Sequence, residues 1–599
     1  MLMVKKRQFF ELYTLLLFAF FFAVPVRTLD FFSIRVSVTE KGVSLIFLIY
    51  SYFKKIFVEH HGFTVFLPSV LILCGAIAAL GILSFFMAHF FNKIATSQHV
   101  ALRRTDSIIG KILSVKPIYI ALFLFVISFG IRMSYMVPGL LHHDSVQSAI
   151  ATEETIKTGK LHGIVGYRYG YILTNVLAYI VPHAVFGINT SEFIITLATI
   201  LFAALAVVML YLFALESLNS PYAAFASGLI FSVSPIFLSV TTYAKDHALS
   251  LFLILTAAYY LIKSIKSDST LHKILFASIL GFALFVRISD VFVSIPFFAL
   301  IYLYPFAVID KENVKFVSRF NVRNLALIFI PLIIAFILFL IFQKGAVTGG
   351  LEGNKFLKPS GNWLDIIMSL FMTLTPLGFF LVVYGAYASA KEKRYFSLFL
   401  MIWMLSVFIF YSGFGTSKLR FFAPLLIPAS IYMGLSLEYI RKRFSVASLF
   451  LLMLSFVLMF LLVQPSLSFR HQHALGKELA LFLSNSTEAD ALIIDYGDLG
   501  VFYQYYANRK TIECPFLEKG QEFNASIAEI DNALKSGIPV YLNNQCFAFK
   551  EINAAELVDF FNRHYDFINI GTAMFENYED IIKIKPYEFT ISRIIPQHT

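Results

Sequence analysis

The sequence predicts a polytopic α-helical membrane protein, with about 13 transmembrane helices and a small C-terminal α/β domain. Of the 599 residues, 58% are hydrophobic and only 14% are charged, and the mean hydropathy is +0.76. A water-soluble fold of this size could not bury so much apolar surface. Apolar runs of about 20 residues also recur along the chain, and each is long enough to cross a hydrocarbon core about 30 Å thick. Lipid is therefore the expected solvent.

The expected membrane spans follow from the apolar runs, taken in order along the chain. The stretch 42–58 is interrupted by Lys54 and Lys55, so we expect it to lie at the membrane interface. The stretch 169–187 is also apolar, but the charge pattern is consistent only if 138–190 stays outside, which predicts a helix lying along the outer leaflet. The remaining apolar runs are the expected spans: 8–26, 63–91, 117–137, 191–215, 221–240, 247–263, 273–288, 290–309, 324–342, 364–389, 395–412, 421–438 and 444–463.

Basic residues gather in the short loops between these spans, for example Lys5 to Arg7, Lys391 to Arg394 and Arg441 to Arg443. Lys and Arg are enriched in cytoplasmic loops of membrane proteins, so these clusters mark the cytoplasmic side. The net charge of +11 is therefore a topology signal and does not indicate binding to nucleic acid. With 13 crossings and a basic start inside, the C-terminal region lies outside the cytoplasm, and the plasma membrane is the expected location.

The chain divides into three predicted regions. Residues 1–116 contain the extra N-terminal membrane helices and a basic loop, 117–463 contain the main membrane domain, and 464–599 form the outer domain. From Gln464 onward, 18 acidic residues outnumber 11 basic ones, and the runs 489–495 and 538–542 read as buried strands between helical patterns near 498–507 and 526–536. Cys514 and Cys546 both fall in this outer domain and could form a disulfide in an oxidising compartment.

A carboxylate just outside a hydrophobic span is the first candidate for chemistry. Arg132 is followed by Pro138, His142, His143 and Asp144 as the sequence turns polar. Asp144 at this position could act on a lipid-borne substrate at the bilayer surface. The alternative is that Asp144 only caps a helix or marks the topology, and the sequence leaves both open.

The residues around Asp144 resemble the first extracytoplasmic loop, here 138–190, of the C-type (GT-C) membrane glycosyltransferases. The resemblance is carried by Asp144 with the run Arg168-Tyr169-Gly170-Tyr171 and a closing Phe186-Gly187, and it covers about residues 117–463. It is strongest to the branch that contains the protein O-mannosyltransferases and the lipid A aminoarabinose transferase. The family's acidic residue at this position is the catalytic base, usually in an Asp-Glu pair, whereas this chain has Ser145 after Asp144. The resemblance implies that Asp144 is catalytic.

Two further motifs add to this resemblance. Lys245 and Asp246 open an apolar helix where the family has a polar motif in its second outer loop, although Asp246 could equally be a helix N-cap. The run from Lys418 through Arg420 to Pro424 resembles the family's late Arg-aromatic-Pro signature. A guanidinium suits a phosphate because its planar fork donates two parallel hydrogen bonds. The resemblance therefore implies that Arg420, with Lys418 nearby, holds a carrier phosphate.

Arg287 and Asp290 lie where one predicted span ends and the next begins. Charges within membrane segments are costly and usually pair or serve a function, so a mutual ion pair and a phosphate contact both remain open for Arg287. The full set of expected substrate-binding residues is Arg420, Lys418, Asp246, Lys245, Arg287, Tyr167, Arg168 and His143.

The implied activity is transfer of a sugar from a polyprenyl (dolichyl or undecaprenyl) phosphate to a hydroxyl of a protein, glycan or lipid acceptor, with mannosyl transfer the type example. The implied sugar transfer requires no cofactor, and no metal site is predicted. A divalent cation stays open because some relatives use one, and His142 and His143 would then need a third ligand, for which His162 is the nearest. The competing classes are a transporter or flippase of envelope glycolipids and a non-catalytic scaffold.

Overall fold

The computed structural model describes residues 116–596, apart from 164–167, 187–190, 268, 302–321, 343–362, 414–418, 496–498, 515–519, 548–553 and 579–583. The predicted spans 8–26 and 63–91, the stretch 42–58 and the rest of the predicted N-terminal region as far as residue 115 lie outside the described residues. The described residues belong to one compact unit, 115–599.

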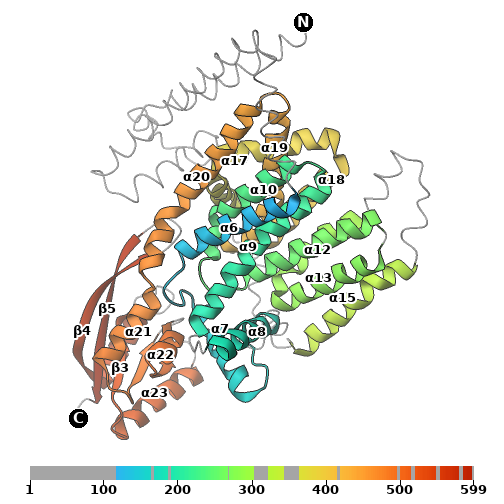
Figure 1. The fold of residues 1–599 in the computed structure, drawn as a ribbon. Coiled ribbons are helices and arrows are strands. Elements are labelled where there is room, and N and C mark those ends of the chain that lie inside the picture. Colours follow the sequence, from blue (N-terminus) through green and yellow to red (C-terminus); the bar gives the residue numbers. More distant parts are fainter. Residues whose placement is uncertain are drawn as a thin grey trace, which may run out of the picture. The chain divides into compact units, whose positions relative to one another are not determined.

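Most of the described residues in the predicted membrane domain form helices (Figure 1). In chain order they are α6 (Pro117–Ser134), α7 (His143–Thr158), α8 (Tyr169–Phe186), α9 (Ser191–Leu218), α10 (Pro221–Val233), α11 (Pro235–Val240), α12 (His247–Ser267), α13 (Thr270–Val286), the 3-10 helix η2 (Ile288–Val293), α15 (Val322–Phe342), α17 (Trp363–Glu392), α18 (Arg394–Gly413), η5 (Leu419–Leu425), α19 (Leu426–Arg441) and α20 (Ser445–Gln472).

Six described helical segments are long and apolar enough to cross a membrane by length and composition: Pro117–Ser134, Ser191–Leu218, His247–Ser267, Thr373–Glu392, Leu419–Arg441 and the segment that begins at Ser445. Shorter apolar helices include Pro221–Val233 and Thr270–Val286. Several helices also expose large apolar side chains. On α15, Ile330, Ile334 and Ile341 recur at helical spacing and are about half exposed, as a lipid-facing stripe requires. The chain is an integral membrane protein, and the number of about 13 helices stays a prediction.

Proline and glycine set several helix boundaries. Pro117 and Pro221 occupy the first positions of α6 and α10, where a missing backbone N–H is harmless. Ser220 also caps α10 by accepting a hydrogen bond from the N–H of Ala223 at 3.3 Å. Gly159 ends α7 with a left-handed φ of 66°, a conformation that costs glycine little. These local signals set the starts of α6 and α10 and the end of α7.

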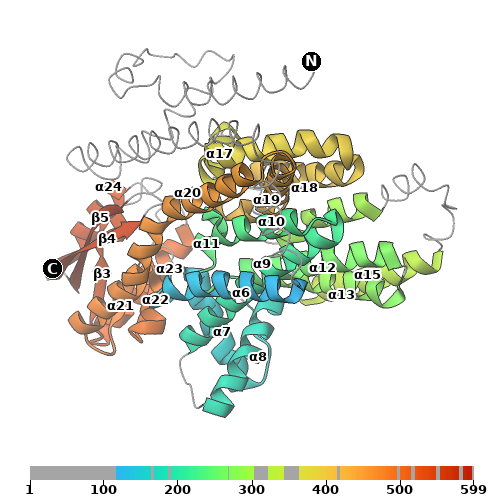
Figure 2. The same cartoon turned by 45° about the horizontal axis from the view of Figure 1, so that its top comes forward.

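Helix α9 packs against α6, α10 and α12, and α19 packs against α10 and α17 (Figure 1). Helices α7 and α8 lie side by side and contact α9 (Figure 2). The described residues of segment 169–187, which was predicted as an outer-leaflet helix, form the helix α8, and its orientation to a bilayer stays a prediction.

The C-terminal region is an α/β fold, as the sequence predicts. Its elements are α21 (Leu475–Ser486), β1 (Leu492–Asp495), α22 (Gly500–Tyr506), β2 (Lys510–Glu513), α23 (Gly520–Lys535), β3 (Val540–Asn543), η8 (Asn544–Phe547), α24 (Ala554–His564), β4 (Tyr565–Tyr578) and β5 (Ile584–Pro596).

The strands form one sheet in the order β2-β1-β3-β5-β4. Strand β1 pairs in parallel with β2 and β3, and Leu492 lies opposite Val540 in the second pairing. Strands β4 and β5 form a long antiparallel hairpin that joins the sheet through β3. Cys514 and Cys546 are buried in the core beside this sheet without a disulfide.

Close packing between α10 and α19 yields the first testable prediction. A Cβ at Gly434 would overlap the carbonyl oxygen of Ala223 and the hydroxyl of Ser227, whereas a Cβ at Gly130 would meet nothing within 4 Å. Membrane helices use small residues to approach this closely. We expect Gly434→Ala to lower the free energy of unfolding by about 1–3 kcal/mol through overpacking. The check is the apparent unfolding temperature in detergent.

The matched control for that substitution is Gly130→Ala, in the exposed portion of α6. It should leave the unfolding temperature unchanged or slightly higher, because alanine is the better helix former. Equal unfolding temperatures for the two variants would contradict the packing described for α10 and α19.

Candidate functional site

Asp144 lies in the first turn of α7, which follows the non-helical segment 135–142. The ring of His142 caps the helix, since its Nδ1 accepts a hydrogen bond from the Asp144 N–H at 3.2 Å. On the buried face of α7, Ser148 and Thr152 satisfy their hydroxyls by donating to backbone carbonyls one turn earlier. The local sequence thus directs the Asp144 side chain out of the helix start and into the protein.

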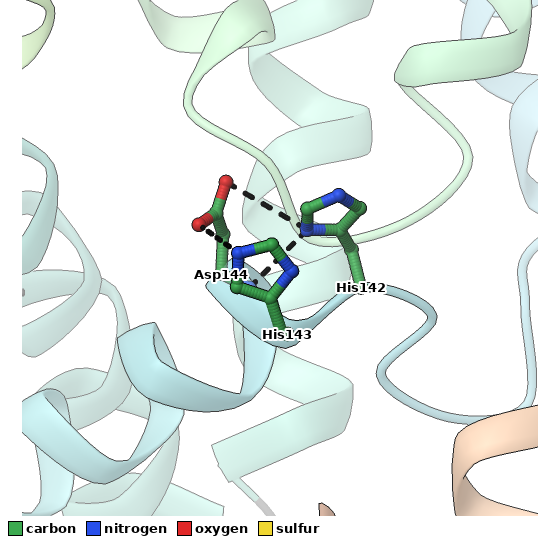
Figure 3. Close-up of side chains that lie close together, drawn as sticks. All are labelled: His142, His143 and Asp144. Atoms are coloured by element: carbon green, nitrogen blue, oxygen red, sulfur yellow. Dashed lines mark hydrogen bonds and ion pairs between the residues drawn. The ribbon is translucent and has the colours of Figure 1, made fainter. Parts of the chain in front are cut away.

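Two histidines flank this carboxylate, as Figure 3 shows. The Nε2 atom of His143 lies 3.0 Å from Oδ1 of Asp144, and the Nδ1 atom of His142 lies 3.7 Å from Oδ2. The two imidazole rings are also in contact with each other, with centroids 4.2 Å apart. Both rings are half-buried, so each keeps some of its surface available to a ligand.

Two cations from other segments also contact Asp144. The Nη1 atom of Arg168, just before α8, lies 3.1 Å from Oδ2, and the Nζ atom of Lys245, just before α12, donates to the same oxygen. Only 8% of Asp144 and 3% of Lys245 is exposed. Burying an isolated charge is costly, so the carboxylate and the two cations stabilise one another only when the three segments meet.

A second carboxylate, Asp246, lies next to the first one. Its Oδ2 atom is 3.2 Å from Nε of Arg168, and its Oδ1 atom is 3.7 Å from Nη1 of Arg287. Arg168 therefore bridges Asp144 and Asp246. Arg287 also lies 3.6 Å from Asp290, so the ion pair that the sequence left open for these two residues is present, and it extends to Asp246.

Arg420 joins the same cluster from the first turn of η5. Its Nη1 atom contacts Nε2 of His142 at 2.8 Å, and its guanidinium lies over the ring of Phe421 at 5.4 Å. Its buried Nε atom has no hydrogen-bond partner among the described residues, and no described carboxylate forms an ion pair with Arg420. Arg420 therefore differs from Arg168 and Arg287, whose charges are balanced by carboxylates.

The pKa values in the cluster follow from burial and charge. Burial raises the pKa of Asp144, but the hydrogen bond from His143 and the charges of Lys245 and Arg168 outweigh it, so the pKa lies well below its usual range. Burial lowers the pKa of Lys245 to about 7 although Asp144 opposes the change. Burial and the charges of Lys245 and Arg420 lower the pKa of His142. Near neutral pH, Asp144 is ionised and His142 is uncharged.

Most of the residues expected from the sequence meet in this cluster. Asp144, His143, Arg168, Lys245 and Asp246 are in direct contact, and Arg287 and Arg420 join through Asp246 and His142. Tyr167 and Lys418 lie outside the described residues.

His247 is a contact that the sequence reasoning missed. Its Nε2 atom lies 2.9 Å from Nη1 of Arg287, and its only sequence signal is its place beside Asp246 at the start of α12.

The residues present fit a divalent cation poorly. His142, His143 and Asp144 have potential ligand atoms within 4.8 Å of one another, whereas His162 contacts Glu154 and Thr158 instead. The expected third ligand is thus not a member of the group. Lys245 and Arg168 already occupy Oδ2 of Asp144, and a third cation, Arg420, contacts His142. A metal ion at this position would have to displace or oppose these charges.

Comparison with known proteins agrees with this architecture. A family model described as dolichyl-phosphate-mannose-protein mannosyltransferase matches residues 176–339. The structure of ArnT from Cupriavidus metallidurans in the apo state is similar, with a TM-score of 0.51 and 11% identity, over 81% of this chain and 98% of that one. The fold is that of the GT-C membrane glycosyltransferases. This confirms the resemblance to the branch that contains the protein O-mannosyltransferases and the aminoarabinose transferase.

Two further structures resemble this chain, with TM-scores just below 0.5. ArnT from Cupriavidus metallidurans bound to undecaprenyl phosphate has a TM-score of 0.48 and 12% identity, over 80% of this chain and 97% of that one. The archaeal oligosaccharyltransferase AglB from Archaeoglobus fulgidus, in complex with an inhibitory peptide and a dolichol-phosphate, has a TM-score of 0.49 and 12% identity, over 79% of this chain and 75% of that one. No curated protein sequence matches the chain.

The family match begins after Asp144 and ends before Arg420. It includes Lys245, Asp246 and Arg287, so the second carboxylate and two of the cations come from the matched segment. The placement of Asp144 and Arg420 beside them rests on the geometry described above.

The lowered pKa of Lys245 predicts how stability depends on pH. Below pH 7 the folded protein holds a buried ammonium, whose burial costs free energy. As the pH rises from about 7 toward 10.5, the folded state binds fewer protons than the unfolded state, so stability rises. Relative to Lys245→Met, the wild type should gain on the order of a few kcal/mol across this window. The measurement is the difference in apparent unfolding temperature at pH 6, 7.5 and 9.

Lys535→Met, at the exposed end of α23, is the matched control, and its difference from the wild type should stay constant across the same pH values. If the difference between wild type and Lys245→Met were equally constant, Lys245 would not change its charge in this range.

Proposed function

We propose that this GT-C chain transfers a sugar from a polyprenyl-phosphate donor to an acceptor hydroxyl, with inversion at the anomeric carbon. The observation that carries the proposal is a single cluster that holds a buried carboxylate, Asp144, and a guanidinium, Arg420, which contacts His142 and which no described carboxylate balances. The fold and the match to a mannosyltransferase family support the same reaction class. Dolichyl-phosphate mannose is the donor named by that family, so a mannosyl donor is the first to test.

The donor phosphate binds at Arg420 in this proposal. When every group is charged, Arg420, Arg168, Lys245 and Arg287 supply four positive charges, whereas Asp144, Asp246 and Asp290 supply three negative ones. The described cluster therefore has an excess of one positive charge before a ligand arrives. A phosphate supplies the missing negative charge, and the guanidinium fork of Arg420 can hold two of its oxygens.

Asp144 acts as the general base. In the structure its Oδ2 atom is paired with Lys245 and Arg168, which lowers its pKa and makes it a weak base. A donor phosphate close to these cations competes for them, so the pairing of Asp144 weakens and its basicity rises when the donor binds. The base is thus activated by the substrate that it serves.

The chemical step is then a direct displacement that forms no covalent enzyme intermediate. The acceptor oxygen attacks the anomeric carbon in line as its proton passes to the carboxylate of Asp144. The bond between the anomeric carbon and the phosphate oxygen breaks, and the electron pair leaves with the polyprenyl phosphate. Arg420 offsets the charge that grows on the departing phosphate.

We propose that this reaction needs no metal ion. Lys245 and Arg168 contact Asp144 at the oxygen through which a metal would be held, and Arg420 supplies the electrostatic stabilisation of the phosphate. Their positive charges take over the role that a divalent cation has in many phosphoryl and glycosyl transfers.

The proposed location of the site is the outer face of the plasma membrane. The supporting observation is the gathering of Lys and Arg in loops such as 391–394 and 441–443, which by the positive-inside bias lie on the cytoplasmic side. The donor keeps its isoprenoid in the bilayer, so its scissile bond lies at headgroup depth. Protein, glycan and lipid acceptors can all present a hydroxyl there.

Removal of the base is the first test of this function. Asp144→Asn should abolish label transfer from radiolabelled polyprenyl-phosphate mannose to crude envelope acceptors, with a loss of at least about 100-fold because an amide cannot accept the proton. Glu154→Gln, on the exposed face of the same helix, is the matched control and should transfer normally.

The outcomes of this assay separate the function classes. Normal transfer by a well-folded Asp144→Asn protein would contradict the catalytic role. Movement of the donor across the bilayer of proteoliposomes, without a new glycosidic bond, would instead support a transporter or flippase. Unchanged wild-type transfer after EDTA treatment is expected, and its loss, restored by Mn²⁺ or Mg²⁺, would overturn metal independence.

The role of Arg420 predicts a different kinetic effect. Arg420→Gln should raise the KM for the donor by about tenfold or more, since a charge-assisted hydrogen bond contributes about 1.5–3 kcal/mol. Arg420→Lys keeps the positive charge but loses the paired hydrogen-bond donors of the guanidinium. Its KM for the donor should therefore lie between those of the wild type and Arg420→Gln. The measurement is initial rate against donor concentration at fixed acceptor. An unchanged KM in both variants would remove Arg420 from the phosphate site.

A further inference from the structure

The C-terminal α/β region packs against the segment that carries Asp144. One buried apolar cluster contains Leu140, Val146 and Ala149 from the Asp144 segment, together with Leu479 of α21 and Phe502 of α22. Helix α22 also contacts α7 directly. Because the two groups share one core, the position of α7 depends on residues that lie more than 300 positions later in the chain.

Polar contacts fix the backbone just before the helix. The hydroxyl of Tyr506 accepts a hydrogen bond from the N–H of Leu140 at 2.9 Å and donates to Glu192 at 2.7 Å. The ammonium of Lys477 donates to the carbonyl of Pro138 at 3.1 Å and to Glu192 at 2.8 Å. Burial and the nearby Glu192 raise the pKa of Tyr506, so its hydroxyl stays protonated and can donate.

A second set of contacts holds the second half of α7. The hydroxyl of Tyr505 donates to Glu153 at 3.2 Å, and Ser191, at the start of α9, donates to the same carboxylate at 2.6 Å. Tyr505 and Ser191 are themselves 2.8 Å apart. The neighbouring residues Tyr505 and Tyr506 of α22 thus bind α7 at Glu153 and the backbone before α7 at Leu140. Each tyrosine also contacts the first turn of α9.

We infer that the C-terminal α/β region is a positioning clamp for the catalytic base, with Tyr506 and Lys477 as positioning residues. Neither residue contacts Asp144 or the cations around it. They hold the backbone at 138–140, so that His142, His143 and Asp144 enter the charged cluster in the geometry described. The inference rests on the proposed function for its catalytic consequence, whereas the holding of the backbone is a structural claim.

Tyr506→Phe tests the clamp. The substitution keeps the ring and removes the hydroxyl, so the Leu140 N–H loses its acceptor and Glu192 loses a donor. We expect kcat to fall about tenfold, because two hydrogen bonds that hold the backbone before the base are lost. The KM for the donor should change less than about twofold, since Arg420 is untouched. Amide hydrogen exchange at residues 139–146 should become faster, with α23 unchanged.

Tyr565→Phe is the matched control. It also removes one tyrosine hydroxyl of the C-terminal region, which donates to Asp531 at 2.8 Å, but Tyr565 lies in a separate apolar core. Its kcat and its exchange at 139–146 should equal those of the wild type. Lys477→Met keeps the apolar stem and removes the donor to Pro138, so it should change exchange and kcat in the same direction as Tyr506→Phe.

The outcomes distinguish the clamp from the proposed function. Unchanged exchange at 139–146 in Tyr506→Phe would overturn the clamp, whatever happens to kcat. Faster exchange with an unchanged kcat would overturn the positioning role. If Tyr506→Phe showed faster exchange at 139–146 but the wild type transferred no sugar, the clamp on the backbone would be supported. The proposed function would then be contradicted.

Discussion

The burial of Asp144 is the constraint on which the arrangement of the site depends. An ionised carboxylate with so little exposure is tolerated only when nearby cations compensate for lost hydration. Arg168 and Lys245 provide that compensation from two segments far away in sequence, before α8 and before α12. The start of α7 therefore cannot reach its place unless α8 and α12 are also in place. Charge balance therefore couples the positions of three segments, the start of α7 and the residues before α8 and α12. Apolar packing alone would leave these positions independent.

Arg168 shows how strongly the site depends on this balance. Its φ of 64° lies in the left-handed region, which costs a residue with a side chain roughly 1 kcal/mol or more. The same conformation lets one guanidinium reach Asp144 with Nη1 and Asp246 with Nε. Two ion pairs in a water-poor site offset that backbone cost, and a lysine could not make both contacts in the same way.

The sequence singled out Asp144 because a carboxylate beside an apolar run stands out locally, and the resemblance to the GT-C family added Lys245, Asp246 and Arg420 as candidates. It could not predict that Arg168 bridges two carboxylates, since that depends on how α7, α8 and α12 approach one another. The strands β1 and β3 were recognisable from short apolar runs, whereas the hairpin of β4 and β5 carries many exposed and polar residues. Tyr506 had no signal at all, because its role depends on Leu140 and Glu192.

Two different kinds of contact hold the Asp144 segment on its two sides. Toward the charged cluster the contacts are ion pairs, which can exchange partners when a phosphate arrives because every member keeps a charged neighbour. Toward the C-terminal region the contacts are apolar packing and hydrogen bonds to backbone atoms, which a ligand of the cluster does not touch. Charges can thus be redistributed around Asp144 while its backbone stays in place. In the proposed mechanism, a base held in this way gains basicity on donor binding without losing its position. The position matters most because misplacement by about 1 Å can cost two orders of magnitude in rate.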